Sequence, residues 1–476
     1  LAPILWISDE LECQSSTKAQ LMRNENFFSL TMLGCLLVVN LLVVSESISQ
    51  RPILSAYLFT TFASLLYAYF FIRFLSTSFF FLTFFLMLFF VEPVLYYLME
   101  EQFQRNIFAV KGYALLTLCG LPLFLLGHAL ISRKSSLEFV DVTYSEEKVG
   151  RVVVLMAIFT AVMIPLLYID AGTTNIVSLG RYELKSEGAG LRVIANFGLY
   201  VASLLFFFVF VQAKKKSVGE LLIWVLLFLV FEVLIFLFYR TRTYLIAHTS
   251  AILVGYYYSS YVFFDSGVLR ITQDFRVKTN KGVIGAIGLA LFALAITLRF
   301  FRGYLQPGQS TQDFDFNLSD FVRRSIEAGD LGYSVVVFDL LDLVPEQYGH
   351  IEGQSYYRLF FLLVPRFLWE DKPINTESIV GQWMRPELVG ISIPPGISGD
   401  LFLHFGFFGV AFMVLYGVAF GLIDRALSVR SFVLWAVSST WIFHLVRGSF
   451  TNPIVIFLVL YFSVFLVDRY AREDHR

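Results

Sequence analysis

The stretch VGELLIWVLLFLVFEVLIFLFY, residues 218–239, decides the class of this protein. Apart from Glu220 and Glu232 it is almost wholly apolar, and an apolar helix of about 20 residues crosses the hydrocarbon core of a bilayer. Similar runs recur along the 476 residues, of which 57% are hydrophobic and only 15% are charged. Soluble domains carry about 25% charged residues. The sequence therefore predicts a polytopic integral membrane protein.

Apolar runs of this length predict an all-α fold with about twelve transmembrane helices. The first 26 residues are polar and lack a signal-peptide pattern, so we expect the first apolar run to be an uncleaved anchor. We place the helices at 27–46, 52–73, 77–99, 107–130, 151–169, 193–213, 218–239, 244–264, 282–300, 399–423, 431–447 and 452–470.

Basic residues gather in alternate connectors of this arrangement. By the positive-inside rule these connectors are cytoplasmic, and both termini then lie inside. The cations concerned are Arg133, Lys134, Lys148, Arg151, Lys214, Lys215, Lys216, Arg270, Arg276, Lys278, Lys281, Arg425, Arg430, Arg469, Arg472 and Arg476.

Three other segments then face outward, and the third is unusually long. They are 170–192, 239–243 and 301–398. Connections beyond about 15 residues are uncommon and are often functional. The apolar stretches 332–344 and 355–364 are too short to span, so we expect amphipathic or re-entrant helices at the outer face.

Arginine is frequent in the segments predicted to face outward, although membrane proteins usually concentrate their cations on the cytoplasmic side. A guanidinium group presents a rigid fork of donors that suits phosphate, so the set favours a lipid-diphosphate site. Each single cation has an alternative role in snorkelling to headgroups or pairing with an acid. The residues are Arg181, Arg192, Arg240, Arg242, Arg299, Arg302, Arg323, Arg324, Arg358, Arg366, Lys372, Arg385 and Arg447.

Three charged side chains are expected close to hydrocarbon, where a charge is costly and usually faces a cavity or a partner. Arg447 ends an apolar run one turn after His444. Glu232 lies deep in the quoted run, and we favour a role as the buried partner of an arginine. Glu92 precedes Pro93 and either marks a kink or lines a cavity.

The sequence PPGISGDLFLHFGFFG, residues 394–409, leads from the long outer segment into the next span. Its prolines and glycines predict irregular backbone before Ser398, a helix opening at Gly399 and Asp400 in the first turn. Asp400 is either a charge that complements the helix end or a base at a cavity mouth. His404 is interpreted as a packed side chain.

The sequence PRFLWEDKP, residues 365–373, predicts a re-entrant turn at the outer surface. Trp369 would anchor it at the interface, while Arg366, Glu370, Asp371 and Lys372 face a reaction cavity. The alternative is a rigid loop in which these charges pair among themselves.

Motifs for nucleotides and metals are absent: the sequence has no P-loop, GxGxxG or HExxH pattern. Cys13, Cys35 and Cys119 form no metal-binding or disulfide pattern, and the net charge of −1 does not favour nucleic acid. We therefore expect no metal, no cofactor and no nucleic-acid partner.

Five segments together resemble the bacterial O-antigen and oligosaccharide repeat-unit polymerases of the Wzy type. They occur in the family's order, on one predicted side of the membrane, between about residues 165 and 455. They are LGRYELKSEGAGLR (179–192), RTRTYLIAH (240–248), PRFLWEDKP (365–373), PPGISGDLFLHFGFFG (394–409) and LVRGSFTN (445–452).

The resemblance implies a glycosyltransferase of the bacterial inner membrane that joins undecaprenyl-diphosphate-linked oligosaccharides on the periplasmic side. We expect arginines to stabilise the departing diphosphate without a metal, and Asp400 to act as base. The catalytic candidates are Arg181, Arg242, Arg366, Arg447 and Asp400. The substrate-binding candidates are Arg192, Arg240, Arg324, Lys372, Tyr182, Tyr244, Trp369, Glu370 and Asp371.

Two rival activities fit the same sequence. An O-antigen ligase shares the donor and the side of the membrane, and a flippase for lipid-linked sugars would share the substrate. Transporters commonly show internal repeats and broken helices near the membrane midplane. Here the irregular, charged material is concentrated in one external segment, which disfavours the flippase. Membrane lipids and a chain-length regulator are further candidate partners.

Overall fold

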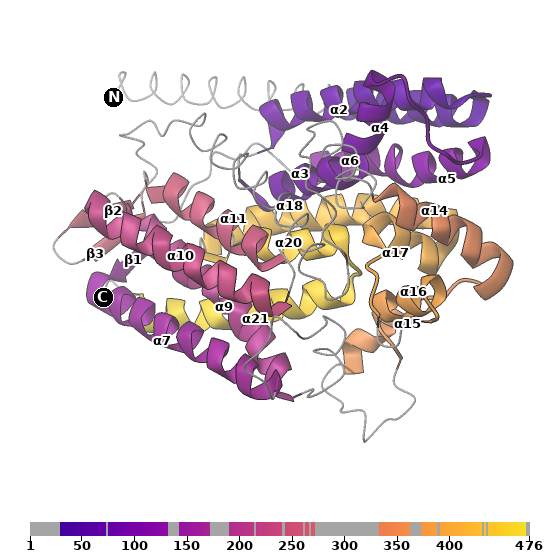
Figure 1. Ribbon diagram of the computed structural model, residues 1–476. Coiled ribbons are helices and arrows are strands. Elements are labelled where there is room, and N and C mark those ends of the chain that lie inside the picture. The colour runs from indigo at the N-terminus through magenta and orange to yellow at the C-terminus, as the bar shows by residue number, and fades with distance from the viewer. Residues whose placement is uncertain are drawn as a thin grey trace, which may run out of the picture.

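The fold is described from a computed structural model. The described residues are 29–72, 75–131, 142–171, 190–213, 216–239, 243–259, 262–265, 268–271, 333–361, 373–387, 391–430, 433–434 and 437–472, and in parts of these ranges only the backbone is described. Helices dominate this part of the chain, as expected (Figure 1).

Six helices within these ranges are long and apolar enough to cross a membrane. They are Ser29–Glu46, Gln50–Phe71, Ile107–Ile131, Val218–Phe236, Gly396–Arg425 and Thr451–Ala471, and the bent pair Thr77–Phe89 and Val91–Leu98 makes a seventh if it is one span. All of them fall on predicted spans. The predicted total of about twelve is not tested, and 282–300 lies outside the described residues.

The helices of the first half follow the predicted spans closely. They are α2 (Gln50–Phe71), α3 (Thr77–Phe89), α4 (Val91–Leu98), α5 (Ile107–Thr117), α6 (Gly120–Ile131), α7 (Glu146–Ala171), α9 (Gly190–Val211), α10 (Val218–Tyr239) and α11 (Thr243–Tyr258).

The second half is more broken. It contains α14 (Ser334–Leu343), the π-helix η3 (Val344–Tyr348), α15 (Gln354–Tyr357), the 3-10 helix η4 (Arg358–Phe361), α16 (Thr376–Met384), α17 (Gly396–Phe405), the 3-10 helix η5 (Gly406–Ala411), α18 (Phe412–Arg430), α20 (Ser438–Arg447) and α21 (Thr451–Ala471). Short helices were expected at 332–344 and 355–364, and α14 and α15 occupy those positions. Their place at the outer membrane face remains a prediction.

A small β-sheet adds to the all-α fold that the sequence predicts. Strands β1 (Val142–Ser145), β2 (Val262–Asp265) and β3 (Val268–Ile271) form an antiparallel sheet in the order β1-β3-β2. The span expected at 244–264 therefore ends at Tyr258. The apolar character of Val262, Phe263 and Phe264 predicts the end of a helix, but β-branched and aromatic residues also favour strands.

The sheet marks one end of the helix bundle. Strand β1 pairs with β3, and Tyr144 forms a β-bridge with Arg472 and donates a hydrogen bond to Asp468 Oδ1 at 2.7 Å. Asp424 accepts from the backbone N–H groups of Thr77 and Ser78, at 2.7 and 3.0 Å. These contacts join connectors that the sequence assigned to a single side of the membrane.

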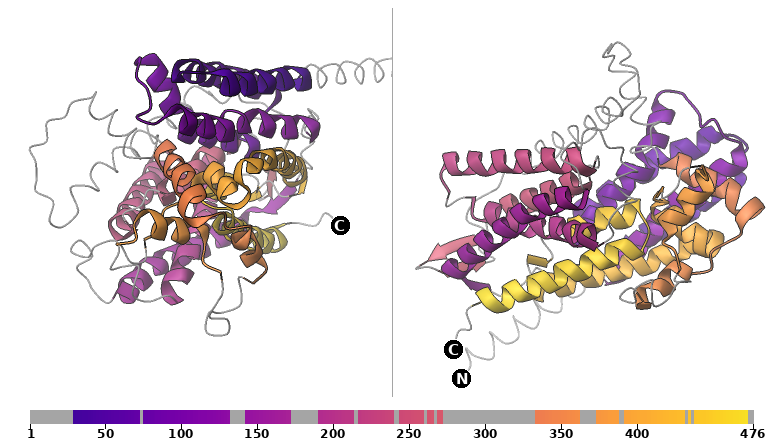
Figure 2. Two further views of the ribbon diagram at one scale, coloured as in Figure 1. Left: turned by 90° about the vertical axis from the view of Figure 1, so that its right-hand side faces the viewer. Right: turned by 60° about the horizontal axis from the view of Figure 1, so that its bottom comes forward.

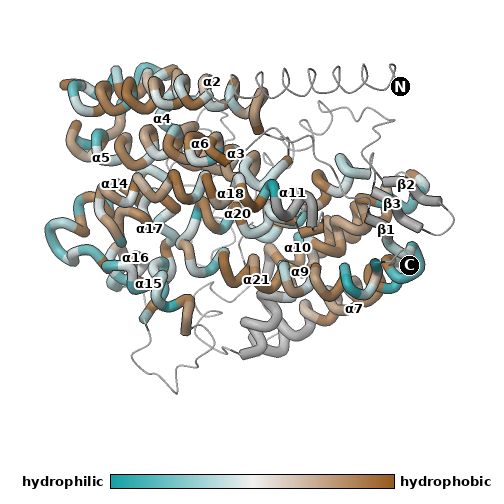
Figure 3. Tube along the Cα trace, turned by 180° about the vertical axis from the view of Figure 1, so that it is seen from behind, coloured by the Kyte–Doolittle hydropathy of each residue, from teal (hydrophilic) through white to brown (hydrophobic). Residues whose placement is uncertain are grey.

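The opposite end carries α14, α15 and α16 (Figures 1 and 2). There Arg105, before α5, forms ion pairs with Asp339 at 2.6 Å and Asp342 at 3.2 Å on α14. Gln50 donates to the carbonyls of Phe103 and Arg105. Hydrophilic residues gather at both ends, and the helices between them are mainly hydrophobic (Figure 3). Which end faces the cytoplasm remains a prediction.

Close backbone packing holds the centre of the bundle together. A methyl group added at Gly417 of α18 would lie 1.9 Å from Phe124 O of α6, and one at Gly127 would lie 2.1 Å from Val414 O. Small residues let membrane helices approach in this way. Beside this contact Phe81 of α3 stacks on Phe124, with ring centroids 4.1 Å apart.

The break between α3 and α4 has an identifiable cause. Pro93 has no N–H group, so the carbonyl of Phe89 loses its partner four residues later. The hydroxyl of Tyr113 donates to Phe89 O at 2.9 Å, and the two helices meet at a bend of 47°. Of the two predictions for Glu92 and Pro93, the structure supports the kink.

Candidate functional site

Asp400 lies in the second turn of α17 and is only 1% exposed. The helix begins at Gly396, where φ is +70°, rather than at Gly399 as expected. Glycine tolerates this left-handed conformation, so the helix can start directly after Pro395. Because the first turn contains no acidic residue, the helix-end role weighed for Asp400 loses its basis.

Tyr356 of α15 fixes one oxygen of this carboxyl. Its hydroxyl donates to Asp400 Oδ2 at 3.0 Å. Burial, together with the nearby carboxyl, raises the pKa of Tyr356 well above its ordinary value, so the phenol keeps its proton. A hydrogen bond to a carboxylate stabilises the charged form. Tyr356 therefore both orients Asp400 and supports its negative charge.

The other oxygen, Oδ1, is buried without a hydrogen-bond partner among the described residues. Thr376 and the backbone of Phe450 also face the carboxyl, but neither bonds to Oδ1 with ordinary geometry. A buried polar atom left unpaired costs about 1–3 kcal/mol. Such an atom in a native fold calls for an explanation, and a substrate group is one.

His404 lies one turn after Asp400 on the same face of α17, and its protonation follows from its contacts. The backbone N–H of Gly353 donates to Nδ1 at 3.0 Å, so in the neutral ring the proton is on Nε2. That nitrogen lies 3.4 Å from Thr376 Oγ1 and 3.7 Å from Asp400 Oδ1. The second distance is too long for a direct hydrogen bond.

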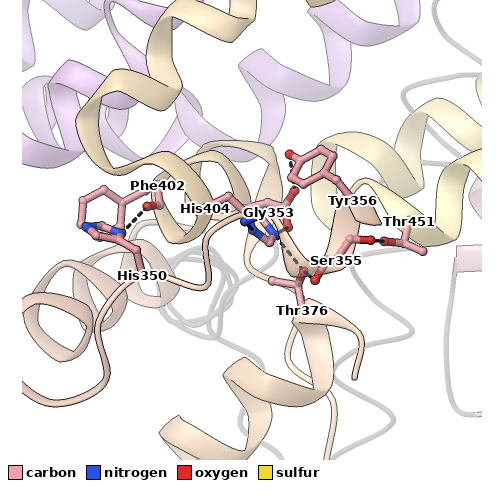
Figure 4. A network of polar contacts seen from close by, with 9 residues as sticks. His350, Gly353, Ser355, Tyr356, Thr376, Phe402, His404 and Thr451 are labelled. Atoms are coloured by element: carbon pink, nitrogen blue, oxygen red, sulfur yellow. Dashed lines mark hydrogen bonds and ion pairs between the residues drawn. The ribbon is translucent and has the colours of Figure 1, made fainter. Parts of the chain in front are cut away.

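Hydroxyl groups from three helices complete this network (Figure 4). Thr376, at the start of α16, donates to Ser355 Oγ at 2.6 Å. Thr451, at the start of α21, donates to the carbonyl oxygen of Ser355 at 3.1 Å. The network around Asp400 thus joins α15, α16, α17 and α21. We call it the Asp400 network: Ser355, Tyr356, Thr376, Asp400, His404 and Thr451.

A second polar cluster lies where α9, α10, α11 and α20 meet. Glu232 contacts His248 Nδ1, and His248 Nε2 lies 2.7 Å from the carbonyl oxygen of Leu199. Since a carbonyl only accepts, Nε2 carries a proton. The partner that the structure gives Glu232 is therefore a histidine, where the sequence favoured an arginine. Both side chains are buried.

Arg447 lies beside this cluster as the last residue of α20. Its Nη1 reaches Thr243 Oγ1 at 3.5 Å. One turn earlier, His444 Nε2 lies 2.8 Å from the hydroxyl of Tyr200, whose ring centroid is 5.0 Å from that of Tyr244. Arg447 is thus near the start of α11. In the sequence, Arg242 directly precedes Thr243, the first residue of that helix.

The turn between α20 and α21 connects the two clusters. Phe450 stacks on Tyr356 with ring centroids 4.9 Å apart. A methyl group at Gly448 would lie 2.8 Å from Glu377 Oε1 on α16. The turn therefore has Arg447 at one end and the Asp400 network at the other. Arg447 directly precedes this turn, and Asp400 is linked to it through Tyr356 and Phe450. Tyr244 is linked to α20 only through Tyr200 and His444.

Most of the other predicted site residues lie outside the described part of the chain. These are Arg181, Tyr182, Arg240, Arg242, Arg324, Arg366, Trp369, Glu370, Asp371 and Lys372; for Arg192, within α9, only the backbone is described. Their predicted roles stay predictions. Within the described ranges, no group of three or more His, Cys, Asp or Glu side chains is arranged to hold a metal ion.

His404, interpreted from the sequence as a packed side chain, is indeed buried. Its place four residues after Asp400 puts it on the same helix face. Three other members of the Asp400 network were missed by sequence reasoning. Tyr356, Thr376 and Ser355 carry no signal in the sequence, since only long-range packing brings them to α17.

No protein-family model, curated protein or solved structure matches this chain.

Proposed function

We propose that the protein is a membrane glycosyltransferase that polymerises lipid-diphosphate-linked oligosaccharide repeat units at the outer face of the bacterial inner membrane. The growing glycan leaves undecaprenyl diphosphate and is transferred to a lipid-linked repeat unit. The observation that carries this proposal is the convergence of Arg447 and the Asp400 network on the turn between α20 and α21.

The reaction needs two kinds of group, a cation for the leaving diphosphate and a base for the acceptor hydroxyl. Arg447 has a permanent charge, and its Nη1 lies 3.5 Å from Thr243 Oγ1 at the start of α11. Asp400 is buried and oriented by Tyr356, and its Oδ1 has no hydrogen-bond partner among the described residues. The two therefore supply the two kinds of group from neighbouring elements.

In the proposed mechanism, the bond between the anomeric carbon and the diphosphate oxygen breaks, and negative charge grows on that oxygen. Arg447 stabilises the charge as it develops, aided by Arg181, Arg242 and Arg366. Groups preorganised in this way lower the barrier more than groups that must move. The acceptor hydroxyl attacks the anomeric carbon and gives its proton to Asp400. No soluble energy source is needed, since the lipid diphosphate carries its own leaving group.

The test uses purified protein in lipid nanodiscs and a defined lipid-diphosphate-linked repeat unit, with product sizes measured on a gel. A ladder of glycan lengths on lipid diphosphate supports the polymerase. Transfer that requires added lipid A core indicates the rival ligase, and movement of the lipid across a vesicle membrane without a new glycosidic bond indicates the flippase.

Variants of Arg447 then test the proposed diphosphate contact. Arg447→Ala is expected to reduce the rate by about 10²–10³-fold, the cost typical of losing one group that stabilises transition-state charge, and Arg447→Lys less. Arg51 is a matched control, because it lies at an exposed position and pairs weakly with Glu100 at 3.8 Å. Normal polymer from Arg447→Ala would exclude the proposed role of this residue.

A further inference from the structure

Two aromatic residues, Tyr348 at the end of η3 and Trp383 of α16, form a stacked pair at the end of the molecule that carries α14, α15 and α16 (Figure 1). The two rings are nearly parallel, with an interplanar angle of 8° and centroids 4.5 Å apart. Tyr348 is still 45% exposed. Much of this residue therefore faces solvent even though Trp383 covers one face of its ring. We call the pair the aromatic platform.

The backbone holds the aromatic platform in a fixed position. Tyr348 ends a π-helix, an element that is rare and occurs frequently at functional sites. The chain then turns at Gly349, where φ is +71°, and the N–H of Ile351 donates to the carbonyl oxygen of Leu403 on α17 at 3.0 Å. On the other side, Trp383 packs against the hydrophobic core. Both rings are therefore attached to packed elements of the fold.

The residues that flank the platform in the sequence are mainly polar. Every residue from Pro345 to His350 is exposed, and so are Gln382 and Arg385 on either side of Trp383. Trp and Tyr also settle at bilayer interfaces. An anchor of that kind is expected among apolar neighbours, whereas this pair is flanked by amide, carboxylate and guanidinium groups. The setting therefore favours a ligand that combines an apolar face with a hydrogen-bonding rim.

A sugar ring has this combination of surfaces. Its faces present C–H groups, and the electron-rich face of an aromatic ring attracts their partial positive charge. The hydroxyl groups around its rim can bond to amide and carboxylate groups such as those of Gln347 and Glu346. Because the two aromatic rings are already stacked on each other, little side-chain freedom is lost when a ligand binds.

We propose that the aromatic platform binds a sugar of the growing glycan at a distance from the bond that reacts. This inference rests on the proposed function and deepens it, because it gives the glycan a second contact. Thr376 of the Asp400 network and Trp383 are seven residues apart on α16, which is about 10 Å along the helix axis. A glycan several sugars long can therefore extend from the proposed reaction site to the platform.

The first experiment measures binding without any reaction. The probe is the oligosaccharide released by mild acid from the lipid-linked repeat unit, so it carries neither lipid nor diphosphate. Its binding to the protein in nanodiscs is followed by saturation-transfer NMR. Tyr348→Ala should weaken binding about fivefold or more, the loss expected when an aromatic stack is removed. Tyr348→Phe keeps the ring and should recover most of the affinity. Equal affinities of Tyr348→Ala and the wild type, or no binding by the wild type, would overturn the inference.

Tyr357→Ala is the matched control. Tyr357 is 52% exposed on neighbouring α15, and its ring meets that of Phe361 at a tilt of 55° rather than in a parallel stack. This variant should bind the oligosaccharide within about twofold of the wild-type affinity. Thermal midpoints of all variants are measured in the same nanodiscs. A loss equal to that of Tyr348→Ala would overturn the inference, because it indicates a general effect on this end of the molecule.

A second arm separates the platform from a membrane anchor. Brominated lipids quench tryptophans that lie in the bilayer, and the signal of Trp383 is the difference between the wild type and Trp383→Phe. The released oligosaccharide should change this signal, and brominated lipid in the nanodisc should not. Quenching by the lipid without a response to the oligosaccharide identifies an interfacial anchor and overturns the inference.

The platform and the proposed function can fail separately. In the polymerisation assay, Tyr348→Ala should shorten the product ladder, because a glycan held less tightly leaves sooner. Normal polymer together with unchanged oligosaccharide binding in Tyr348→Ala overturns the platform alone. If the wild type makes no polymer but Tyr348→Ala still lowers oligosaccharide binding, polymerisation is wrong and the platform stands as a glycan-binding site.

Discussion

Two regions of the molecule place a buried carboxyl beside a histidine, and they do so in opposite ways. Glu232 and His248 are in direct contact, and the second ring nitrogen of His248 reaches Leu199 O. Asp400 and His404 stay 3.7 Å apart, and Asp400 Oδ1 has no hydrogen bond within the described residues. The first pair is closed and joins three helices. In the second pair the buried Oδ1 is left without a hydrogen bond, which is why we treat Asp400 rather than Glu232 as the candidate site residue.

The largest difference in polymerisation rate between the two regions is expected when each acid is changed to its amide. Asp400→Asn removes the proposed base without changing its shape and should lower the polymerisation rate by about 10²–10⁴-fold, the range for a lost general base. Glu232→Gln should leave the rate within about threefold, because the introduced amide can donate to His248. Rates on a defined lipid-linked acceptor measure both.

The outcome that breaks this comparison is an equal loss at the two positions. It would mean that Glu232 takes part in the chemistry as much as Asp400 does. A normal rate for Asp400→Asn would remove the base from the proposed mechanism.

For the free energy of unfolding the order should be reversed, with a larger loss at Glu232 than at Asp400. Glu232→Ala leaves the buried ring of His248 without its partner, and breaking such a pair costs about 3–5 kcal/mol in the free energy of unfolding. Asp400→Ala should cost less, since Oδ1 is already without a bond. Denaturant unfolding in detergent measures both.

The double variant Glu232→Ala with His248→Ala supplies the control. Its cost should be smaller than the sum of the two single costs, because contacting residues are coupled. Strict additivity would show that the contact between the two side chains does not stabilise the fold.

The smallest effects come from removing one hydroxyl in each region. Tyr200→Phe loses the contact with His444 and should cost about 1 kcal/mol of stability with little change in rate. Tyr356→Phe loses the bond to Asp400 and should lower the rate about 10- to 100-fold, since hydrogen bonds to charged groups are worth about 1.5–3 kcal/mol. A larger rate loss from Tyr200→Phe than from Tyr356→Phe would reverse the roles assigned to the two regions.

Span positions could be predicted from the sequence because hydrocarbon thickness imposes a minimum apolar length, and the described candidate spans fall where runs such as 218–239 and 452–470 predict them. The sheet could not be predicted, since Val262, Phe263 and Phe264 suit a strand as well as a helix. Asp400 stood out as an acid after a Pro-Gly break, but the start of its helix depended on the conformation of Gly396. Tyr356 was invisible, because its partner lies 44 residues away along the chain.

The glycine contact between α6 and α18 has a consequence for biogenesis. Gly127 and Gly417 are about 290 residues apart, and ribosomes add about 5–20 residues per second, so α18 emerges roughly 15–60 seconds after α6. During that interval the face of α6 around Gly127 lacks the helix that covers it in the folded protein. A chain that stops before residue 417 therefore leaves this close backbone contact unmade.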